Sequence, residues 1–189
     1  EYPERYKHIN FNLNESDKIN MLYRKEIKSI GKIYGLVNNA ANAYDDIVTN
    51  AQCEPLEEMF KINVFSPIML SKYAIRDMLT TDTRGSLVHI SSVSAHTGYK
   101  GLSMYASTKG ALEAFSLGIA RECGPKGIRS NIVAPGFMET DISAKLTDEQ
   151  RDKIYKRTSF KAATDIDSVA DGVVWLLSDK AKSVTGSIM

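Results

Sequence analysis

The sequence has few cysteines and histidines, almost no net charge and no long hydrophobic run. Its two cysteines and three histidines are not spaced like the ligands of a metal ion. The 24 basic and 23 acidic residues give a net charge of +1, which indicates neither a nucleic-acid nor a membrane partner. No stretch of the sequence is apolar over the length of a bilayer, and its start does not resemble a secretory signal. We therefore expect a cytoplasmic protein without a resident metal.

The sequence does contain a regular alternation of strand-like and helix-like segments. Short apolar or alternating segments predict strands over residues 6–13, 33–37, 86–92 and 128–134. Apolar residues at helical spacing predict helices over residues 19–30, 56–78, 102–123, 147–157 and 166–178, the second of them kinked or broken near Pro67. This alternation is typical of one α/β domain, here residues 1–189, with a parallel sheet covered by helices on both faces.

Tyr105 and Lys109 form the centre of the most informative stretch. They lie four residues apart in a predicted helix, so their side chains share one face, one turn apart. A phenol ordinarily has a pKa near 10, and a neighbouring ammonium is expected to lower that pKa towards neutral pH. The spacing alone is a weak signal, because the chain has nine tyrosines and many lysines.

Three predicted strands end in residues that are unusual for a sheet: Asn38–Asn39, Ser91–Ser92 and Pro135–Gly136. Ligands of open α/β sheets bind at the carboxyl ends of the strands, so we expect all three at one ligand-binding edge. Ser92 precedes Tyr105 by 13 residues, which allows a loop that returns to the same edge. A hydroxyl, a phenol and an ammonium can then meet one carbonyl oxygen. The asparagine pair and the Pro-Gly pair could equally form plain turns.

Taken together and in this order, five pieces of the sequence resemble the short-chain dehydrogenase/reductase family, most closely its 3-oxoacyl-[acyl-carrier-protein] reductases. These pieces are Asn38-Asn39-Ala40, Asn63, Ser92, Tyr105 with Lys109, and residues 135–140 (Pro-Gly-Phe-Met-Glu-Thr). The resemblance spans essentially the whole chain. It implies a doubly wound, Rossmann-like fold and the reduction of a ketone to a secondary alcohol by hydride transfer, in the context of fatty acid biosynthesis.

The resemblance implies a catalytic tetrad of Asn63, Ser92, Tyr105 and Lys109. Tyr105 would be the proton donor in carbonyl reduction, and Ser92 would hold the substrate oxygen. Lys109 would bind the nicotinamide ribose and lower the pKa of Tyr105, while Asn63 would hold a water that passes protons to solvent. The chemistry agrees, because an oxygen that gains charge is stabilised by hydrogen-bond donors already in place.

The resemblance also implies a set of cofactor-binding residues: Asn38, Ala40, Tyr105, Lys109, Pro135, Gly136, Met138 and Thr140. The members within residues 135–140 would contact the nicotinamide end, although Met138 could serve packing alone. Asn38 and Ala40 would form a wall on the adenosine side. The reductase-like segment at residues 135–141 favours NADP(H) over NAD(H).

The expected partners are a small-molecule or acyl-carrier-bound carbonyl substrate and further copies of the chain. The helices over residues 56–79 and 102–123 resemble the pair that forms the family's dimer face, so we expect a homotetramer or homodimer. Two other functions stay open: a sugar or steroid alcohol dehydrogenase of the same family, and a catalytically silent binding subunit. His96 and Tyr99 are candidates for lining the substrate pocket, with exposed loop positions as the alternative.

The sequence departs from the family at its cofactor-binding end. The glycine-rich phosphate turn, Thr-Gly-x-x-x-Gly-x-Gly, does not occur before Asn38, and Ala41 stands where the family has glycine. In the doubly wound order, that turn belongs with two strands that lie between the predicted strands over residues 6–13 and 33–37. We therefore expect these 189 residues to be part of a longer protein, lacking the first two strands, which an intact-mass measurement would test. Alone, they should not bind a dinucleotide tightly.

Overall fold

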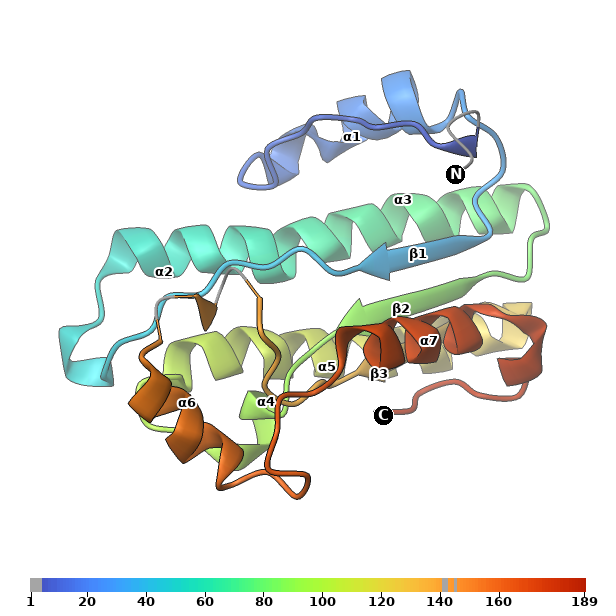
Figure 1. Ribbon diagram of the computed structural model, residues 1–189. Helices are drawn as coiled ribbons and strands as arrows, with labels where there is room; N and C mark the ends of the chain where they lie inside the picture. The colour runs from blue at the N-terminus through green and yellow to red at the C-terminus, as the bar shows by residue number, and fades with distance from the viewer. Residues whose placement is uncertain (1–4, 141–142, 145) are drawn as a thin grey trace.

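The sheet at the centre of the molecule has three parallel strands. In the computed structural model, which describes residues 5–140, 143–144 and 146–189, the strands are β1 (Gly35–Asn38), β2 (Ser86–Ile90) and β3 (Arg129–Val133). They are hydrogen-bonded in the order β1-β2-β3 (Figure 1). The last residues of the chain continue the sheet, because Ile188 forms a parallel bridge with Ile132. The expected parallel α/β sheet is therefore confirmed.

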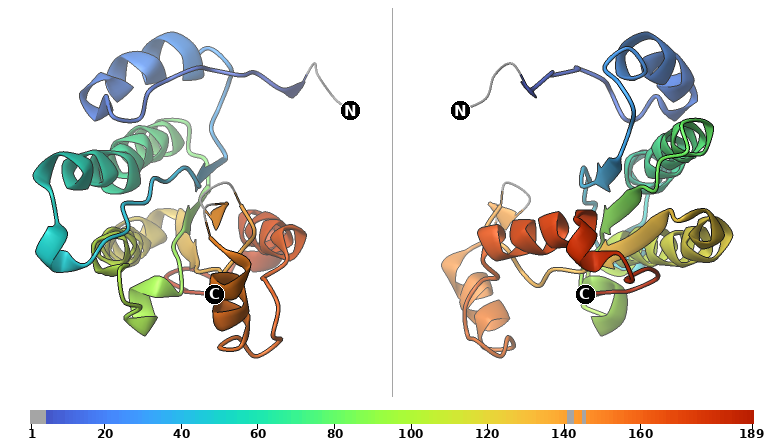
Figure 2. Two further views of the ribbon diagram at one scale, coloured as in Figure 1. Left: turned by 60° about the vertical axis from the view of Figure 1, so that its left-hand side comes forward. Right: turned by 90° about the vertical axis from the view of Figure 1, so that its right-hand side faces the viewer.

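Seven α-helices surround this sheet in the described part of the chain. They are α1 (Ile19–Leu22), α2 (Cys53–Phe60), α3 (Ser66–Thr80), α4 (Ser94–Thr97), α5 (Ser103–Cys123), α6 (Asp148–Tyr155) and α7 (Ile166–Leu177). Figure 2 shows α3 and α5 on one face of the sheet and α7 on the other. Helices on both faces complete the doubly wound arrangement that the sequence predicts.

Strand β2 contributes side chains to two hydrophobic clusters, one on each face of the sheet. Leu87 packs with Met78 of α3 and Ile119 of α5, whereas Val88 packs with Leu176 of α7. Successive side chains of a strand point to opposite faces, so Leu87 and Val88 serve different clusters. Every residue of β2 and β3 is buried, so neither strand shows the strict alternation of apolar and polar residues that marks a half-exposed strand.

The long helix predicted over residues 56–78 is interrupted, as expected, close to Pro67. A π-helical turn at Lys61–Phe65 separates α2 from α3, and Pro67 stands in the first turn of α3. Residues on both sides of Pro67 are helical, so its missing N–H removes a hydrogen bond to the preceding turn, which favours an irregular turn at this point. A π turn of this kind often marks a functional site, and this one contains Asn63.

The prediction of a strand over residues 6–13 is wrong. This segment runs past α1 and stays outside the sheet, whose hydrogen-bonded members among the described residues are β1, β2, β3 and the bridge at Ile188 (Figure 1). A strand needs a neighbour to receive its main-chain hydrogen bonds. The doubly wound order places two further strands between this segment and β1, and the described residues do not supply them. Side-chain contacts hold the segment instead, such as Ser66 Oγ donating to Leu13 O at 2.5 Å.

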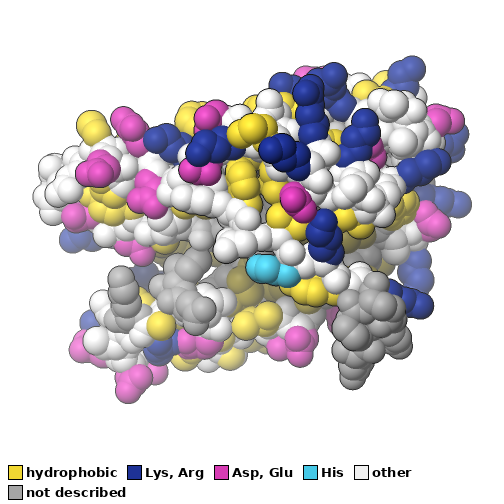
Figure 3. Space-filling model, turned by 90° about the horizontal axis from the view of Figure 1, so that it is seen from above, with side chains coloured by type: hydrophobic (Ala, Val, Ile, Leu, Met, Phe, Trp, Pro, Cys, Tyr) yellow, Lys and Arg dark blue, Asp and Glu magenta, His cyan; other side chains and the backbone are white. Residues whose placement is uncertain are grey.

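The surface over α1 is rich in basic side chains. Figure 3 shows lysine and arginine gathered on the face that carries α1, where Lys18, Arg24, Lys25 and Lys28 are exposed. Ion pairs of Lys7 with Glu26 and of Lys18 with Glu15 offset part of this charge. Within the described residues, no helix combines the length and the hydrophobicity that a membrane crossing requires.

Candidate active site

The carboxyl ends of β2 and β3 are joined just where Ser92 lies. The Ser91 amide donates to Val133 O at 2.7 Å, and the Val93 amide donates to Pro135 O at 3.1 Å. Ser92 is half-buried between them, and its Oγ accepts a hydrogen bond from the Ser94 amide at 3.2 Å. Because that contact uses Oγ as an acceptor, the hydroxyl proton of Ser92 remains able to point at a substrate oxygen.

Lys109 connects helix α5 to the same edge of the sheet. Its side chain is buried, and Nζ donates a hydrogen bond of 2.8 Å to Ile90 O at the last residue of β2. An ammonium has three donors, so two remain for other partners. Nζ lies 5.5 Å from the centre of the Tyr105 ring, one helical turn earlier. The expected neighbourhood of phenol and ammonium is thus present.

The pKa shifts of this pair differ from the sequence-based expectation. Burial raises the pKa of the Tyr105 phenol to about 12, and the Asp45 carboxylate adds to the increase. Burial also lowers the pKa of the Lys109 ammonium to about 8. The prediction that Lys109 lowers the Tyr105 pKa is therefore wrong for this structure, in which the ammonium donates to Ile90 O and burial disfavours both charged forms.

Asn63 joins the π turn to the start of α5. It is 1% exposed, and its Oδ1 accepts from the Asn42 amide at 2.8 Å. Its Nδ2 donates to Asn42 O at 2.8 Å and to Thr108 Oγ1 at 3.0 Å. The Thr108 hydroxyl in turn donates to Tyr105 O at 2.8 Å. Asn63 thereby connects the loop after β1 to the helix turn that holds Tyr105 and Lys109.

Asn38 and Ala40, at the end of β1, differ in their burial and therefore in their access to a ligand. The Asn38 side chain is buried, and its Nδ2 contacts Ser71 Oγ at 3.1 Å and His89 Nδ1 at 3.1 Å. Both amide hydrogens are therefore used inside the protein, and any cofactor contact at Asn38 falls to its other atoms. Ala40 is exposed beyond the strand end.

The segment Pro135–Thr140 leaves β3 and is held in place by later parts of the chain. Thr164 N donates to Phe137 O at 2.7 Å. A Cβ added to Gly136 would lie 2.7 Å from Thr164 Oγ1, so this position needs glycine for the close approach. Thr140 N donates to Ser143 Oγ at 2.9 Å, and Ser143 Oγ donates to Met138 O at 3.1 Å.

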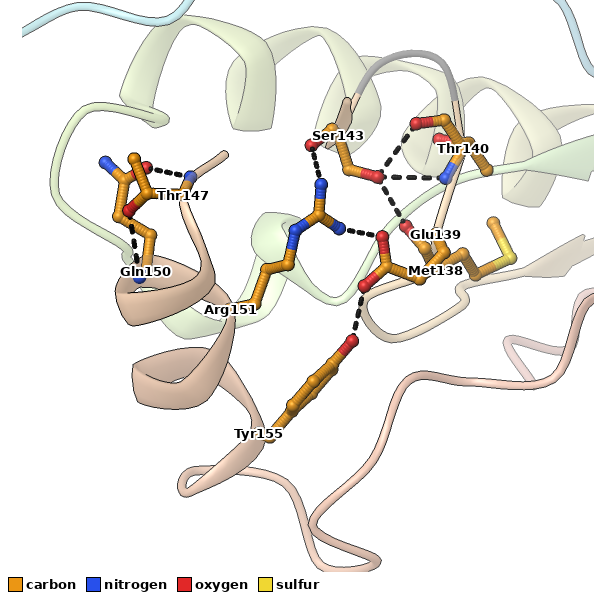
Figure 4. A network of polar contacts seen from close by, with 8 residues as sticks. All are labelled: Met138, Glu139, Thr140, Ser143, Thr147, Gln150, Arg151 and Tyr155. Carbon is orange, nitrogen blue, oxygen red and sulfur yellow. Dashed lines mark hydrogen bonds and ion pairs between the residues drawn. The ribbon is translucent and has the colours of Figure 1, made fainter. Parts of the chain in front are cut away.

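Helix α6 is held against this segment by polar contacts around Glu139 and Arg151 that the sequence did not reveal (Figure 4). Arg151 binds the Glu139 carboxylate through Nη1 and Ser143 O through Nη2, the latter at 3.1 Å. The Tyr155 hydroxyl donates to the other Glu139 oxygen, and its ring packs edge-on against Phe137. A capping box between Thr147 and Gln150 begins the helix.

These groups fit the nicotinamide half of a dinucleotide. Lys109 offers two spare donors, Ser92 offers a hydroxyl proton, and the carboxyl ends of β1, β2 and β3 lie side by side at the edge where such ligands bind. The part of the sequence before Asn38 contains no glycine-rich pyrophosphate turn, so this fit is confined to the nicotinamide end.

Two site residues went unnoticed in the sequence. Glu113 follows Lys109 by one turn of α5, is 6% exposed, and contacts Ser91 and His96. The sequence feature that could have identified Glu113 is its spacing: it follows Tyr105 and Lys109 at intervals of four residues and so lies on the same helix face. Thr108 is the second, and nothing in its sequence position indicated its contact with Asn63. The His96 side chain is half exposed and turned to Glu113, and Tyr99 is partly buried.

The fold and site define a protein class, and comparison with known proteins supports it. A family model described as enoyl-(acyl carrier protein) reductase matches residues 1–189. The chain belongs to the short-chain dehydrogenase/reductase family, and the relatives and solved structures that it matches include oxidoreductases and chains with bound nicotinamide cofactor.

Two curated relatives indicate the range of similar enzymes. The 3-oxoacyl-[acyl-carrier-protein] reductase FabG of Escherichia coli (strain K12) is 32% identical over 183 residues, which cover 97% of this chain and 75% of the relative. Carbonyl reductase [NADPH] 2 of Sus scrofa is 32% identical over 165 residues, which cover 86% of this chain and 68% of the relative.

Solved structures share the fold over almost the whole chain. ElxO with NADP bound has a TM-score of 0.91 at 27% identity, covering 100% of this chain and 77% of that chain. A gluconate 5-dehydrogenase from Burkholderia cenocepacia J2315, in complex with NADP and tartrate, has a TM-score of 0.90 at 23% identity, covering 95% and 71%. The second similarity concerns the fold alone.

Proposed function

We propose that the protein reduces a ketone to a secondary alcohol with NADPH, as a 3-oxoacyl-[acyl-carrier-protein] reductase does. The observation that carries this proposal is the position of Lys109 Nζ, which lies 5.5 Å from the centre of the Tyr105 ring and donates to Ile90 O, two residues before Ser92. The similarity to the Escherichia coli reductase, at 32% identity, supports the substrate class.

In this mechanism Tyr105 is the proton donor. With a pKa of about 12, its phenol is fully protonated at neutral pH and can give its proton to the carbonyl oxygen as that oxygen gains charge. Ser92 donates a second hydrogen bond to the same oxygen. The bound nicotinamide supplies the hydride that adds to the carbonyl carbon.

Lys109 holds the cofactor in this scheme. Its two spare donors bind the hydroxyls of the nicotinamide ribose, while the third keeps its contact with Ile90 O.

Asn63 helps to return a proton from solvent through a bound water. Both of its amide hydrogens are engaged, with Asn42 O and Thr108 Oγ1. A water at this position therefore binds the second lone pair of Oδ1 or the main-chain oxygen, with the amide holding the local geometry.

The segment after β3 provides the remaining contacts with the cofactor. Pro135, Gly136, Met138 and Thr140 lie along the nicotinamide end, and Asn38 and Ala40 lie on the adenosine side. The ElxO structure contains NADP, which supports NADPH as the reductant. A 4-hydroxyisoleucine dehydrogenase of the same fold is complexed with NADH. The experiment below therefore compares NADPH with NADH.

The test is the oxidation of NADPH by the full-length protein with an acetoacetyl thioester, followed by absorbance at 340 nm. We expect turnover with NADPH to exceed turnover with NADH. Activity only with sugar or steroid ketones would replace the acyl substrate by another substrate of the family. Absence of turnover across a ketone panel with both cofactors would favour a silent binding subunit.

Further copies of the chain are the proposed partners in assembly. Phe65, in the turn between α2 and α3, and Leu117 of α5 are exposed hydrophobic residues on the two helices expected to form a dimer face. Burying such residues between copies stabilises an oligomer. Sedimentation should give a dimer or tetramer, and a monomer alone would contradict the proposed assembly.

A further inference from the structure

One buried carboxylate, that of Glu113, contacts residues before and after Ser92 in the turn that carries it. Glu113 lies on α5 and is 6% exposed. Its Oε1 accepts a hydrogen bond of 2.5 Å from Ser91 Oγ, on the residue directly before Ser92. Its two oxygens lie 3.1 and 3.0 Å from His96 Nε2, on the helix α4 that directly follows.

The contacts of α5 with this turn form a ladder along one helix face. Lys109 Nζ binds Ile90 O, and one turn later Glu113 binds Ser91 and His96. Tyr105 precedes Lys109 on the same face, because side chains four residues apart lie above one another. The helix that presents the phenol thus also holds the strand end and the turn that present the Ser92 hydroxyl.

A buried carboxylate is costly unless hydrogen bonds compensate it. Here the compensation comes from two residues that lie on either side of Ser92 in the chain, Ser91 and His96. Within the turn, the Ser94 amide donates to Ser92 Oγ and the Ala95 amide donates to Ser92 O. Moving residues 91 and 96 would therefore move Ser92 with them.

We propose that Glu113 is a positioning residue. It fixes the Ser92 turn against α5, so that the Ser92 hydroxyl and the Tyr105 phenol can both donate a hydrogen bond to the carbonyl oxygen of the substrate. This proposal rests on the proposed function for the roles of Ser92 and Tyr105. Glu113 itself touches Ser91 and His96 and takes part through them. A small displacement of an aligned group is enough to slow a reaction without weakening the binding of cofactor.

The kinetic test compares substitutions at Glu113 in the full-length protein. Glu113→Ala should lower kcat about tenfold and leave the Kd of NADPH within about twofold, because the lost contact positions Ser92 and does not touch the cofactor. Glu113→Gln should recover most of kcat, since its amide oxygen still accepts from Ser91. Ser91→Ala and His96→Ala should each lower kcat less than Glu113→Ala.

The matched control is Glu122→Ala, which removes an exposed carboxylate from the same helix and should leave kcat unchanged. If kcat of Glu113→Ala stays within about twofold of the wild type, the positioning role is rejected. Equal losses in Glu113→Ala and Glu113→Gln would also reject it, since they would show that the hydrogen bond from Ser91 is irrelevant.

Hydrogen exchange decides the same question without turnover. The Ala95 and His96 amides donate to Ser92 O and Val93 O, each at 3.0 Å, and report on the turn. In Glu113→Ala they should exchange about tenfold faster, while the Ile132 amide, bonded to Ser187 O, should not change. Unchanged exchange at Ala95 and His96 would overturn the proposal. A wild-type protein with no ketone reduction would reject the proposed function alone, because the exchange result would still stand.

Discussion

Lys109 Nζ lies 5.5 Å from the centre of the Tyr105 ring and is hydrogen-bonded to the end of the central strand, at Ile90 O. The ammonium is thus anchored beside the phenol by the sheet. Burial raises the pKa of Tyr105 to about 12 and lowers that of Lys109 to about 8. The phenol therefore holds its proton at neutral pH. Of the two groups, the lysine has the pKa closer to neutral pH.

Tyr105→Phe should abolish ketone reduction while leaving cofactor binding nearly intact. The phenylalanine ring fills the same space but has no proton to donate, so kcat should fall by about a thousandfold or more. NADPH affinity, measured by fluorescence titration, should change by less than about twofold, because Lys109 remains in place. Tyr6→Phe, at a position 72% exposed, is the control and should keep full activity. Turnover that survives Tyr105→Phe would reject the role of proton donor.

The pH dependence of catalysis should report on Lys109. Burial disfavours the charged form, so the ammonium is present below its pKa of about 8 and is lost above it. We expect kcat/KM for NADPH to fall above pH 8 by about tenfold per pH unit, measured between pH 6 and 10. Lys109→Arg should remove this fall, because a guanidinium stays charged throughout the range. A wild-type profile that is flat to pH 10 would contradict the assignment.

Asn63→Ala should destabilise the protein as well as slow it. The change leaves the Asn42 amide and carbonyl without their partner, which lies 2.8 Å from each, and should cost about 2–4 kcal/mol in free energy of unfolding. Urea denaturation measures this cost. Asn63→Asp can still accept from the Asn42 amide but cannot donate to its carbonyl, so it should be intermediate. Asn50→Ala, which loses an exposed contact with Asp46, should have little effect.

His89 should make the protein sensitive to acid. Burial lowers the pKa of His89 to about 4, whereas the unfolded chain titrates near 6.5. Between these values the unfolded state binds more protons, so stability falls as the pH falls from 6.5 to 4, by about 3 kcal/mol in total. His89→Leu should lose less stability than the wild type over this range in urea denaturation. His8→Leu, at an exposed position, should behave like the wild type.

Arg151→Met should loosen the contact of α6 with the segment after β3. Arg151 joins Glu139 to Ser143 O, and its loss should raise the KM for the ketone about tenfold with kcat changed less than about twofold. Steady-state kinetics on the acetoacetyl thioester measure both constants. The control is Lys153→Met, which removes an exposed pair with Glu149 on the same helix. Equal KM values in the two variants would show that these contacts do not affect substrate binding.

Much of the fold followed from local pattern. Helix α5 covers residues 103–123 against a prediction of 102–123, and β2 and β3 lie within their predicted segments. The apolar residues of these segments and the Gly-Pro stop after Cys123 act over a few residues, so they can be recognised without tertiary contacts. The interruption near Pro67 was predicted for the same reason, although its form, a π turn, was not.

The failed strand over residues 6–13 shows the limit of that approach. Its alternating pattern is suitable for a strand, but a strand exists only when neighbouring main chains accept and donate its hydrogen bonds. At the end of this segment, main-chain oxygens accept instead from a side chain and from the following turn: Leu13 O from Ser66 Oγ at 2.5 Å and Asn12 O from Glu15 N at 3.0 Å. Pattern indicates which residues suit a strand, and the neighbours decide whether one forms.

The sequence by itself determined the order of strands and helices from β1 onward, the parallel α/β class and the family to which the chain belongs, because these depend on residue types and on spacings within short segments. Only the tertiary structure decided the pKa shifts of Tyr105 and Lys109. It also decided that the Asn38 side chain bonds to Ser71 in the interior and that Glu113 bonds to Ser91, beside Ser92. These properties depend on burial and on partners tens of residues away along the chain. A carboxylate or an ammonium changes its behaviour when water is replaced by particular neighbours, and the folded chain alone brings those neighbours together.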